Sequence, residues 1–238
     1  MSLGRTLKTE VQQWRRLLRN RIYVSPKNEQ GIVQEFQKLY YNSHLFAKSF
    51  GDTRWRGVAT LKCPLDLWVY QEILNEVKPD WLLETGTCEG GSALFLSDMC
   101  DLLGKGRVVT IDIEHREGRP KHPRLEYWHG SSVDAKFLEK LRSLIRPEEK
   151  VIVFLDSDHS KVHVLNELRA YQGLVSKGSY LVVEDTNING HPVYPEFGPG
   201  PMEAVDEFLN ENKDFVIDAS REKFYMTFNP RGFLKKIR

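Results

Sequence analysis

Short runs of almost wholly apolar residues alternate with segments of helical periodicity along most of this 238-residue chain, and this alternation constrains the fold more than any other feature. The clearest runs lie at 81–84, 107–112, 150–156 and 179–185. Near-continuous apolar strands are buried on both faces, which is typical of parallel sheets covered by helices on either side. The sequence therefore predicts an α/β fold.

The segments between these runs complete the expected pattern. We expect a shorter strand over 124–127 and helices over 65–77, 91–103, 135–145, 161–174 and 202–210. Two last strands, 215–219 and 224–228, would form an antiparallel edge hairpin joined by a turn at 220–222. The Pro- and Gly-rich segment 190–201 is too long for a simple connection, so we expect a functional loop or lid there, with a disordered insertion as the alternative.

The first 60 residues differ from the rest and predict a helical extension or lid ahead of a domain spanning 61–238. Apolar residues fall at helical spacing near the start of the chain, at Leu7, Val11, Trp14, Leu17 and Leu18. The segment 5–21 carries one acidic residue, Glu10, and six basic residues: Arg5, Lys8, Arg15, Arg16, Arg19 and Arg21. Such a basic amphipathic helix could contact a membrane surface or an anionic glycolipid, and a docking helix with a solvated basic face is the more ordinary alternative.

Charge and cysteine content argue against several classes of protein. The 34 Lys and Arg residues balance 33 Asp and Glu residues, so the chain lacks the positive excess expected of a protein that binds nucleic acid. Cys63, Cys88 and Cys100 cannot all pair and lack the spacing of a zinc site, which indicates a reducing compartment. Since no apolar run reaches the roughly 18 residues that would span a membrane, we expect a cytoplasmic protein.

Acidic residues stand at the ends of four predicted strands, as Glu84, Asp112, Asp156 and the pair Glu184-Asp185. Ligands of open parallel sheets bind outside the carboxyl ends of the strands, where the loops converge. A carboxylate buried there costs desolvation energy unless it meets a donor or a cation. The pattern therefore indicates a binding or catalytic site.

The first of these strand ends runs into a glycine-rich turn, ETGTCEGGS at 84–92. Its spacing departs from the dinucleotide fingerprint G-x-G-x-x-G, which argues against an NAD-dependent dehydrogenase. Glycines would let a ligand approach the backbone, and Asp112, at the end of the next strand, could accept both hydroxyls of a ribose. Together they predict a cofactor that contains a nucleoside.

The second group of acids is more specific. Asp156 follows one strand and Glu184 and Asp185 follow the next, so the three carboxylates can converge. Three oxygen ligands suit a hard divalent cation such as Mg²⁺. The alternative is that these acids cap helices or pair with Lys161 and Arg169. His159 could be a base, a further ligand or a residue that starts a helix.

Together these motifs resemble class I S-adenosylmethionine-dependent methyltransferases of the metal-dependent O-methyltransferase kind, and within them the cephalosporin hydroxylase / rhamnosyl O-methyltransferase family. The resemblance runs from Arg54 to the C-terminus. Its segments are Trp55-Arg56-Gly57 with Lys62 and Pro64, ETGTCEGGS at 84–92, VVTIDIE at 108–114, FLDSDHS at 154–160, LVVEDTNINGHPV from 181, GPGPMEAVDEFL from 198 and REKFYMTFNPRG from 221.

The resemblance implies a Rossmann-like class I methyltransferase fold, with a mostly parallel seven-stranded sheet, a C-terminal antiparallel hairpin and N-terminal helices. It implies transfer of a methyl group from S-adenosylmethionine, with Mg²⁺, to a hydroxyl of a sugar, a glycosylated natural product or a glycolipid. The implied metal ligands are Asp156, Glu184 and Asp185, and the catalytic base is Asp158 or His159. The implied cofactor-binding residues are Glu84, Gly86, Thr87, Ser92, Asp112, Ser132 and Asp156.

Other functions stay open at this point. A related enzyme of the hydroxylase type could use the same pocket without methylating, and a non-catalytic binding protein could keep a degenerate site. We expect Trp55, Tyr194, Phe197 and the N-terminal helices to shape the acceptor pocket, because flat aromatic faces suit sugar rings. The aromatic N-terminal region also makes a homo-oligomer the expected assembly.

Overall fold

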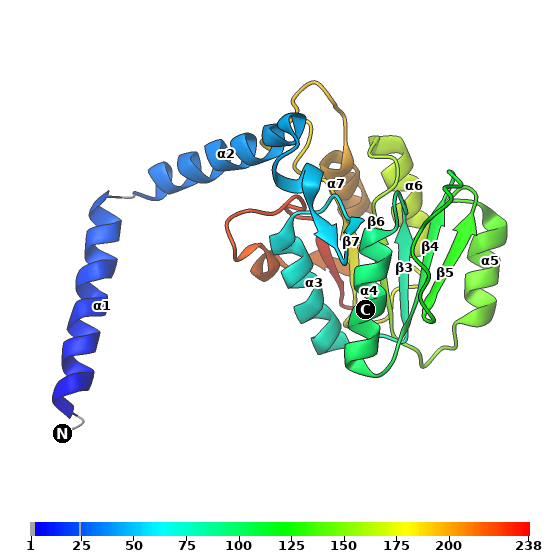
Figure 1. The fold of residues 1–238 in the computed structure, drawn as a ribbon, viewed down its shortest axis with the longest axis horizontal. Coiled ribbons are helices and arrows are strands. Elements are labelled where there is room, and N and C mark those ends of the chain that lie inside the picture. Colours follow the sequence, from blue (N-terminus) through cyan, green and yellow to red (C-terminus); the bar gives the residue numbers. More distant parts are fainter. Residues whose placement is uncertain (1–2, 24) are drawn as a thin grey trace.

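A seven-stranded sheet forms the centre of the computed structural model, which describes residues 3–23 and 25–238 (Figure 1). Five neighbouring strands are parallel, β9 runs antiparallel to β7, and β8 runs antiparallel to β9. The predicted Rossmann-like, mostly parallel sheet is thereby confirmed. Its order is β5 (Leu125–His129), β4 (Arg107–Asp112), β3 (Trp81–Thr85), β6 (Val151–Leu155), β7 (Tyr180–Val183), β9 (Phe233–Lys236) and β8 (Phe215–Ile217).

Helices cover both faces of the sheet and bury it completely at its centre (Figure 1). Side chains of one strand alternate between the two faces, so neighbours such as Leu82 and Leu83 enter different halves of the core. Leu82 and Ile152 pack with α3 (Pro64–Val77) and α4 (Gly91–Leu103). Leu83 and Val153 pack with the helices of the opposite face, α5 (Ala135–Leu144), α6 (Lys161–Tyr171) and α7 (Pro201–Glu211).

The edge hairpin exists, but the prediction that 224–228 supplies its second strand is wrong. The strand β9 lies further along the chain, at 233–236, and a short 3₁₀ helix, η3 (Ala219–Glu222), follows β8. Met226 and Phe228 are instead buried in a small apolar cluster against Tyr40 and Tyr41 of the N-terminal region. Tertiary packing has therefore overridden the strand propensity of this segment.

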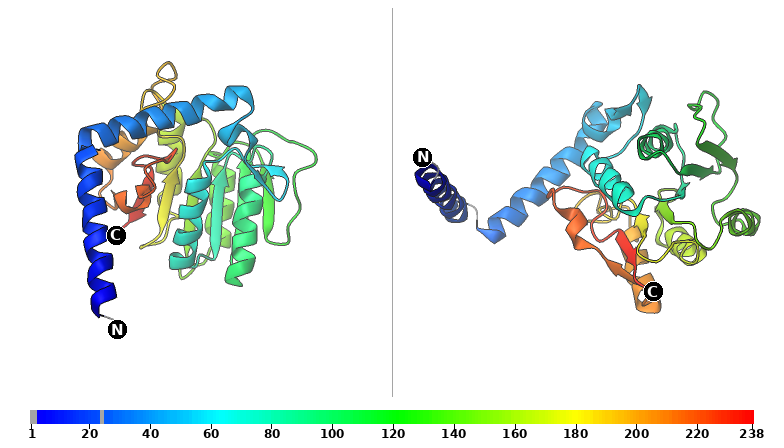
Figure 2. Two further views of the ribbon diagram at one scale, coloured as in Figure 1. Left: turned by 60° about the vertical axis from the view of Figure 1, so that its left-hand side comes forward. Right: turned by 90° about the horizontal axis from the view of Figure 1, so that it is seen from below.

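The N-terminal segment forms two long helices, α1 (Leu3–Tyr23) and α2 (Pro26–Asn42), followed by the 3₁₀ turns η1 (Ser43–Phe46) and η2 (Ser49–Asp52). The helix α1 projects away from the body, whereas the end of α2 reaches the edge of the sheet layer (Figures 1 and 2). Residues 9–19 are all exposed. Four side chains of the predicted basic helix lie outside those that the structure describes: Arg5, Leu7, Lys8 and Arg21.

A small hairpin of β1 (Arg54–Trp55) and β2 (Val58–Ala59) connects this region to α3. The cysteines Cys63, Cys88 and Cys100 are all free thiols, and only Cys88 is exposed. Among the described residues, no helix combines the length and the apolar character needed to cross a bilayer.

Candidate active site

The register of the central strands brings the predicted acids to one edge of the sheet. Thr85 pairs with Leu155 and Leu155 pairs with Val183, so the residues that follow them, Gly86, Asp156 and Glu184, emerge side by side. Because β3, β6 and β7 are parallel, this edge is the carboxyl edge at which such sheets bind ligands.

Gly86 allows the turn after β3 to pass directly over the end of β6. Its φ is +83°, and a Cβ atom placed there would lie 1.9 Å from the carbonyl oxygen of Asp156. The backbone N–H of Gly86 donates to Ile111 at 2.9 Å, which ties the same turn to β4. Only glycine adopts this conformation and tolerates this approach without strain.

Asp112 at the end of β4 organises the turn through its carboxylate. Its Oδ2 accepts from the backbone N–H groups of Thr87 and Cys88, both at 3.0 Å, and from Arg119 Nη2 at 2.9 Å. Its Oδ1 accepts from the backbone N–H of Glu114 at 2.8 Å. A carboxylate oxygen can accept two hydrogen bonds, so Oδ1 retains capacity for a ligand hydroxyl. No sequence pattern pointed to Arg119, which reaches Asp112 from the loop after β4.

A cavity of about 510 Å³ opens beside this turn, within the roughly 300–1,000 Å³ typical of small-molecule sites. Five of the predicted site residues line it: Gly86, Asp112, Ser132, Asp156 and Asp158. The predicted cofactor residues Glu84, Thr87 and Ser92 are buried and are not part of the lining.

Glu84 lies beneath the glycine turn as a buried brace, with only 2% of its surface exposed. Its Oε2 accepts from the hydroxyl of Thr110 at 2.6 Å, and that hydroxyl also lies 2.7 Å from Thr87 Oγ1. Burial raises the pKa of Glu84 to about 7, although hydrogen bonds from Ser92 and Thr110 oppose the shift. Glu84, Thr87 and Ser92 thus support the turn from below.

Under the part of the cavity lined by Ser132 lies another buried carboxylate, Glu167. Its Oε1 accepts from Ser157 Oγ at 2.7 Å and lies 3.3 Å from His163 Nε2, and this contact raises the pKa of His163. His163 Nε2 also lies 3.2 Å from Ser132 Oγ, while the Tyr171 hydroxyl donates to the carbonyl of Ser132 at 2.7 Å. Side chains of α6 therefore fix Ser132.

Three predicted residues come together as a group that could hold a metal. Ligand atoms of Asp156, His159 and Asp185 all lie within 4.8 Å of one another. His159 Nε2 is 3.2 Å from Asp185 Oδ2. Asp185 has a φ of +55°, a left-handed conformation that is uncommon outside glycine and clusters at functional sites.

Glu184, the remaining predicted ligand, faces a residue to which the sequence assigned no role. Lys62 is 5% exposed, and its Nζ lies 2.8 Å from Glu184 Oε1 and 2.5 Å from Asp156 Oδ2. Burial alone would lower the pKa of Lys62, but the adjacent carboxylates outweigh it and the pKa is raised. Lys62 stood among the residues of the family resemblance, yet no local charge pattern singled it out.

Hydrogen bonds from the C-terminal part of the chain hold the last two acids in place. Asn229 Oδ1 accepts from the backbone N–H of Asp185 at 3.0 Å, and Asn229 Nδ2 donates to the Tyr70 hydroxyl at 2.6 Å. Tyr70, from α3, in turn hydrogen-bonds Glu184. The acid centre, by which we mean Asp156, Glu184 and Asp185, is thus braced from two elements far apart in sequence.

The two candidate bases occupy different surroundings. Asp158 is exposed, and its Oδ1 accepts from the backbone N–H of Ser160 at 2.7 Å, just before α6. Hydrogen bonds from Ser160 lower the pKa of Asp158, which weakens it as a proton acceptor. His159, by contrast, is only partly exposed and turns toward Asp185.

One aromatic residue of α2, Tyr41, lies within electrostatic reach of Asp185. The pKa of Tyr41 is raised to about 12. Burial is the main cause, and the negative charge of Asp185 and the nearby Tyr194 add to the shift. Tyr194 lies in the predicted lid loop and contacts Phe197, with ring centroids 5.6 Å apart. Trp55 is engaged elsewhere, since its indole N–H donates to Asp98 at 2.7 Å.

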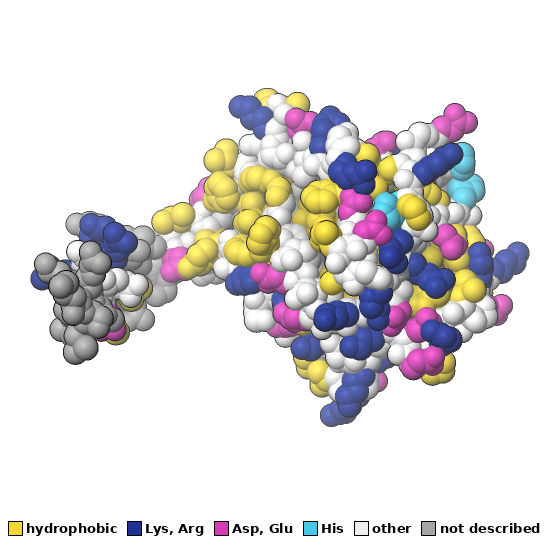
Figure 3. All heavy atoms as spheres, turned by 60° about the horizontal axis from the view of Figure 1, so that its bottom comes forward, with side chains coloured by type: hydrophobic (Ala, Val, Ile, Leu, Met, Phe, Trp, Pro, Cys, Tyr) yellow, Lys and Arg dark blue, Asp and Glu magenta, His cyan; other side chains and the backbone are white. Residues whose placement is uncertain are grey.

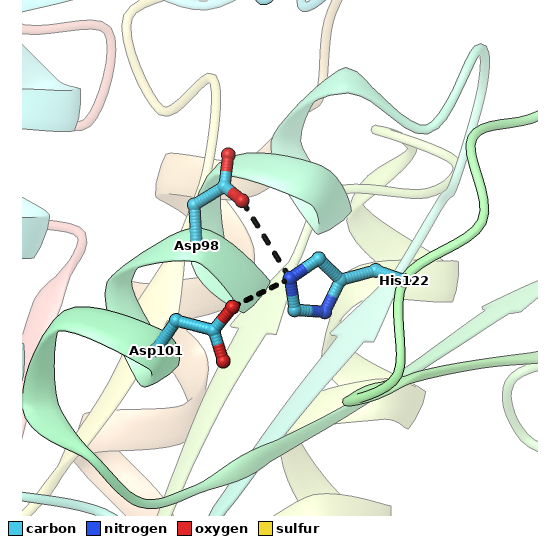
Figure 4. A group of neighbouring side chains, drawn as sticks. All are labelled: Asp98, Asp101 and His122. Carbon is cyan, nitrogen blue, oxygen red and sulfur yellow. Dashed lines mark hydrogen bonds and ion pairs between the residues drawn. The ribbon is translucent and has the colours of Figure 1, made fainter.

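A second group of possible metal ligands, Asp98, Asp101 and His122, lies on the outer side of α4 (Figure 4). His122 Nε2 is 3.1 Å from Asp101 and 3.6 Å from Asp98, and Nδ1 accepts from the backbone N–H of Arg124 at 3.1 Å. Nε2 therefore carries the proton and has no lone pair for a metal. Arg56 also pairs with Asp98, and Arg124 also pairs with Asp101. The group is therefore a set of structural ion pairs that connects α4 to neighbouring segments.

The family model described as Rhamnosyl O-methyltransferase/CmcI matches residues 47–237. A rhamnosyl O-methyltransferase of Mycobacterium bovis (strain BCG) is 40% identical over 210 residues, which cover 85% of this chain and 84% of that protein. An apo structure of CmcI has a TM-score of 0.60 at 24% identity, covering 78% of this chain and 76% of its own. A CmcI structure with Mg and SAM has a TM-score of 0.60 at 22% identity, covering 78% and 77%.

These matches confirm the resemblance predicted from the sequence and, at the level of the family, the expected class of O-methyltransferase. The two structures add a likeness of fold. The chain belongs to the rhamnosyl O-methyltransferase/CmcI family.

Proposed function

We propose that this protein uses S-adenosylmethionine and Mg²⁺ to methylate a hydroxyl of a rhamnosyl-type sugar carried by a small molecule or a glycolipid. The observation that carries the proposal is the position of Asp156, which belongs both to the acid centre and to the lining of the cavity beside Gly86 and Asp112. The name of the mycobacterial relative supports the acceptor, and the CmcI structure with Mg and SAM supports the cofactors.

The side chains of the acid centre fit a hard divalent cation. Mg²⁺ prefers carboxylate oxygens and is commonly held by few protein ligands, which leaves positions for substrate. We assign Asp156, Glu184 and Asp185 as its ligands, because the nitrogen of His159 is the less suitable donor for such an ion.

The cavity fits the methyl donor in size and in its polar groups. We assign Oδ1 of Asp112 to a ribose hydroxyl and Ser132 to the adenine, and Gly86 to the methionine end. Glu84, Thr87 and Ser92 would act on the cofactor through the turn they support.

A bound divalent cation would make the acceptor hydroxyl more acidic and fix its position. We assign the proton transfer to His159 rather than Asp158, since histidine is the commonest general base in enzymes. With its Nε2 proton directed to Asp185 Oδ2, His159 has the Nδ1 lone pair left to receive a proton. Asp185 would then stabilise the imidazolium. The rest of the catalysis is orientation of the two reacting groups.

Tyr41 and Tyr194 are assigned to the acceptor side. Tyr41 lies within electrostatic reach of Asp185, and Tyr194 in turn lies within electrostatic reach of Tyr41, since both contribute to the raised pKa of Tyr41. They come from α2 and from the loop 190–200, so the acceptor would be enclosed by the N-terminal helices on one side and this loop on the other. Glu203 anchors the loop, since it accepts from Asn189 Nδ2 at 3.0 Å and from the backbone N–H of Gly200 at 2.7 Å.

The decisive experiment measures S-adenosylhomocysteine formed from S-adenosylmethionine with a synthetic rhamnoside as acceptor. Product should form with Mg²⁺, stop in EDTA and resume when Mg²⁺ is restored. Asp185→Asn should lose turnover yet bind S-adenosylhomocysteine within about threefold of wild type, whereas Asp206→Asn, at an exposed ion pair with Arg231, should keep the full rate. Turnover that is unaffected by EDTA would refute the metal role. Cofactor binding without transfer to any sugar would favour the hydroxylase-type alternative.

We also propose that the N-terminal helices bind a second copy of the chain in a reducing, cytoplasmic compartment, in keeping with the free thiols. Figure 3 shows apolar side chains gathered where the projecting N-terminal helices join the rest of the molecule. On α2, Ile32, Phe36 and Leu39 are 59%, 50% and 65% exposed. Their i, i+4, i+7 spacing forms one stripe, as in helix–helix packing, and Trp14 and Leu18 of α1 are similarly exposed.

Light scattering during size-exclusion chromatography tests this assembly. Wild type should elute as an oligomer and Phe36→Glu should shift toward the monomer, while Gln34→Glu on the same helix should not. A monomeric wild type that sediments with vesicles containing anionic lipid would refute self-association and assign α1 to a membrane surface.

A further inference from the structure

The buried Lys62 occupies an unusual position for a lysine. Lysine is almost never fully buried unless it is paired, and Lys62 is 5% exposed with contacts to two carboxylates at once. Those two carboxylates, Asp156 and Glu184, are two of the three to which we assign the metal.

The backbone around Lys62 fixes it there. Two hydrogen bonds attach the hairpin of β1 and β2 to α4: Trp55 and Arg56 each donate to the carboxylate of Asp98, at 2.7 and 2.8 Å. The chain then passes the start of α4, where a Cβ atom on Gly91 would lie 2.2 Å from the carbonyl oxygen of Ala59. Lys62 follows two residues before α3 begins, so its side chain enters the acid centre from a backbone held on both sides.

Lys62 changes the net charge of the acid centre. Three carboxylates and one ammonium leave two negative charges before His159 is considered, and one divalent cation neutralises them. Without Lys62 the same carboxylates would present three negative charges. Lys62 bonds Asp156 Oδ2 and Glu184 Oε1 directly, so these oxygens would be shared between the ammonium and the incoming ion.

We propose that Lys62 is a positioning residue that serves as an internal counter-cation: it holds the acid centre together without metal and weakens the binding of Mg²⁺. This inference rests on the proposed metal-dependent function. Like charges a few ångströms apart repel strongly in a buried site, so removing the ammonium strengthens the attraction of the centre for a divalent cation. A lysine with only a packing role would, on removal, leave that affinity unchanged or weaken it.

The test compares Mg²⁺ binding by isothermal titration calorimetry, without cofactor, in wild type and Lys62→Met. The variant should bind Mg²⁺ at least about tenfold more tightly, while its melting temperature in EDTA falls below that of wild type. Lys62→Arg keeps the charge and should stay within about threefold of the wild-type affinity. Lys161→Met removes a lysine paired with Glu207 at 2.7 Å, away from the acid centre, and should bind as wild type does.

The outcomes separate this inference from the proposed function. Equal or weaker Mg²⁺ binding by a folded Lys62→Met refutes the counter-cation role and leaves the metal-dependent function standing. Wild type that binds no Mg²⁺ refutes the metal dependence, and the inference with it. If Lys62→Met folds only when Mg²⁺ is present, the proposal is supported, and Lys62→Gln then supplies the comparison of affinities.

Discussion

The turn at Gly86 gives the sharpest prediction about how the site is built. In Gly86→Ala, the new Cβ atom would lie 1.9 Å from the carbonyl oxygen and 2.5 Å from the carbonyl carbon of Asp156, and 2.9 Å from Ser157 Cα. All three are backbone atoms of the segment after β6, so no side chain can move aside. The turn and the end of β6 must separate, at the point where the cavity and the acid centre meet.

A matched control separates this clash from backbone strain. Gly178 has nearly the same φ, +80° against +83°, but nothing lies within 4 Å of its Cβ position. Gly178→Ala should therefore cost only the left-handed strain, about 1 kcal/mol. Gly86→Ala adds overpacking of typically 1–3 kcal/mol, so we expect a total of about 3 kcal/mol or more.

Urea unfolding followed by circular dichroism gives both free energies of unfolding. For a chain of this size the expected difference of about 2 kcal/mol corresponds to roughly 4–8 °C in melting temperature. Gly86→Ala should also bind S-adenosylhomocysteine more weakly, whereas Gly178→Ala should bind it as wild type does. Equal stability of the two variants would refute the close approach of the turn to β6.

Three further predictions concern single side chains. Asp112→Ala should weaken S-adenosylhomocysteine binding at least about tenfold by calorimetry, and unchanged affinity would show that the ribose binds elsewhere. Burial raises the pKa of Asp66 from 3.8 to about 7, so the folded state holds a proton that the unfolded state has released. Wild type should lose stability as the pH rises from about 4 to 7, and urea melts of Asp66→Asn should show a smaller loss; parallel profiles would contradict this. His122→Ala should leave Mg²⁺ binding by calorimetry unchanged, because Nδ1 accepts a backbone N–H and Nε2 faces two carboxylates; weakened binding would contradict the structural assignment.

The layered fold could be predicted because its signal is local. A strand buried on both faces must be apolar throughout, and 81–84, 107–112, 150–156 and 179–185 carry that signature in a few residues each. The acids after these strands could be assigned to one edge because parallel strands all end at the same side of a sheet. The register of Leu155 with Val183 then sets Asp156 beside Glu184.

The edge hairpin shows where local reasoning fails. Alternation in 224–228 suits a strand, but Phe228 is buried beside Tyr40 and Tyr41, and its backbone N–H donates to Asp66 at 2.8 Å. The place beside β7 is taken by 233–236, where Gly232 lets the chain pass close to the carbonyl of Val183. Propensity does not decide which of two suitable segments pairs, because the choice depends on what each can bury.

The sequence by itself determined the α/β class, the family and the set of acids from which a site could be built. Only the tertiary structure decided how those acids are partnered. Lys62 lies 94 positions before Asp156, and Arg119 reaches Asp112 from a loop without periodicity. Hydrophobic patterns repeat over a few residues and can be read along the chain. A buried ion pair depends on where two distant backbones come to rest, and that is fixed only when the whole core has packed.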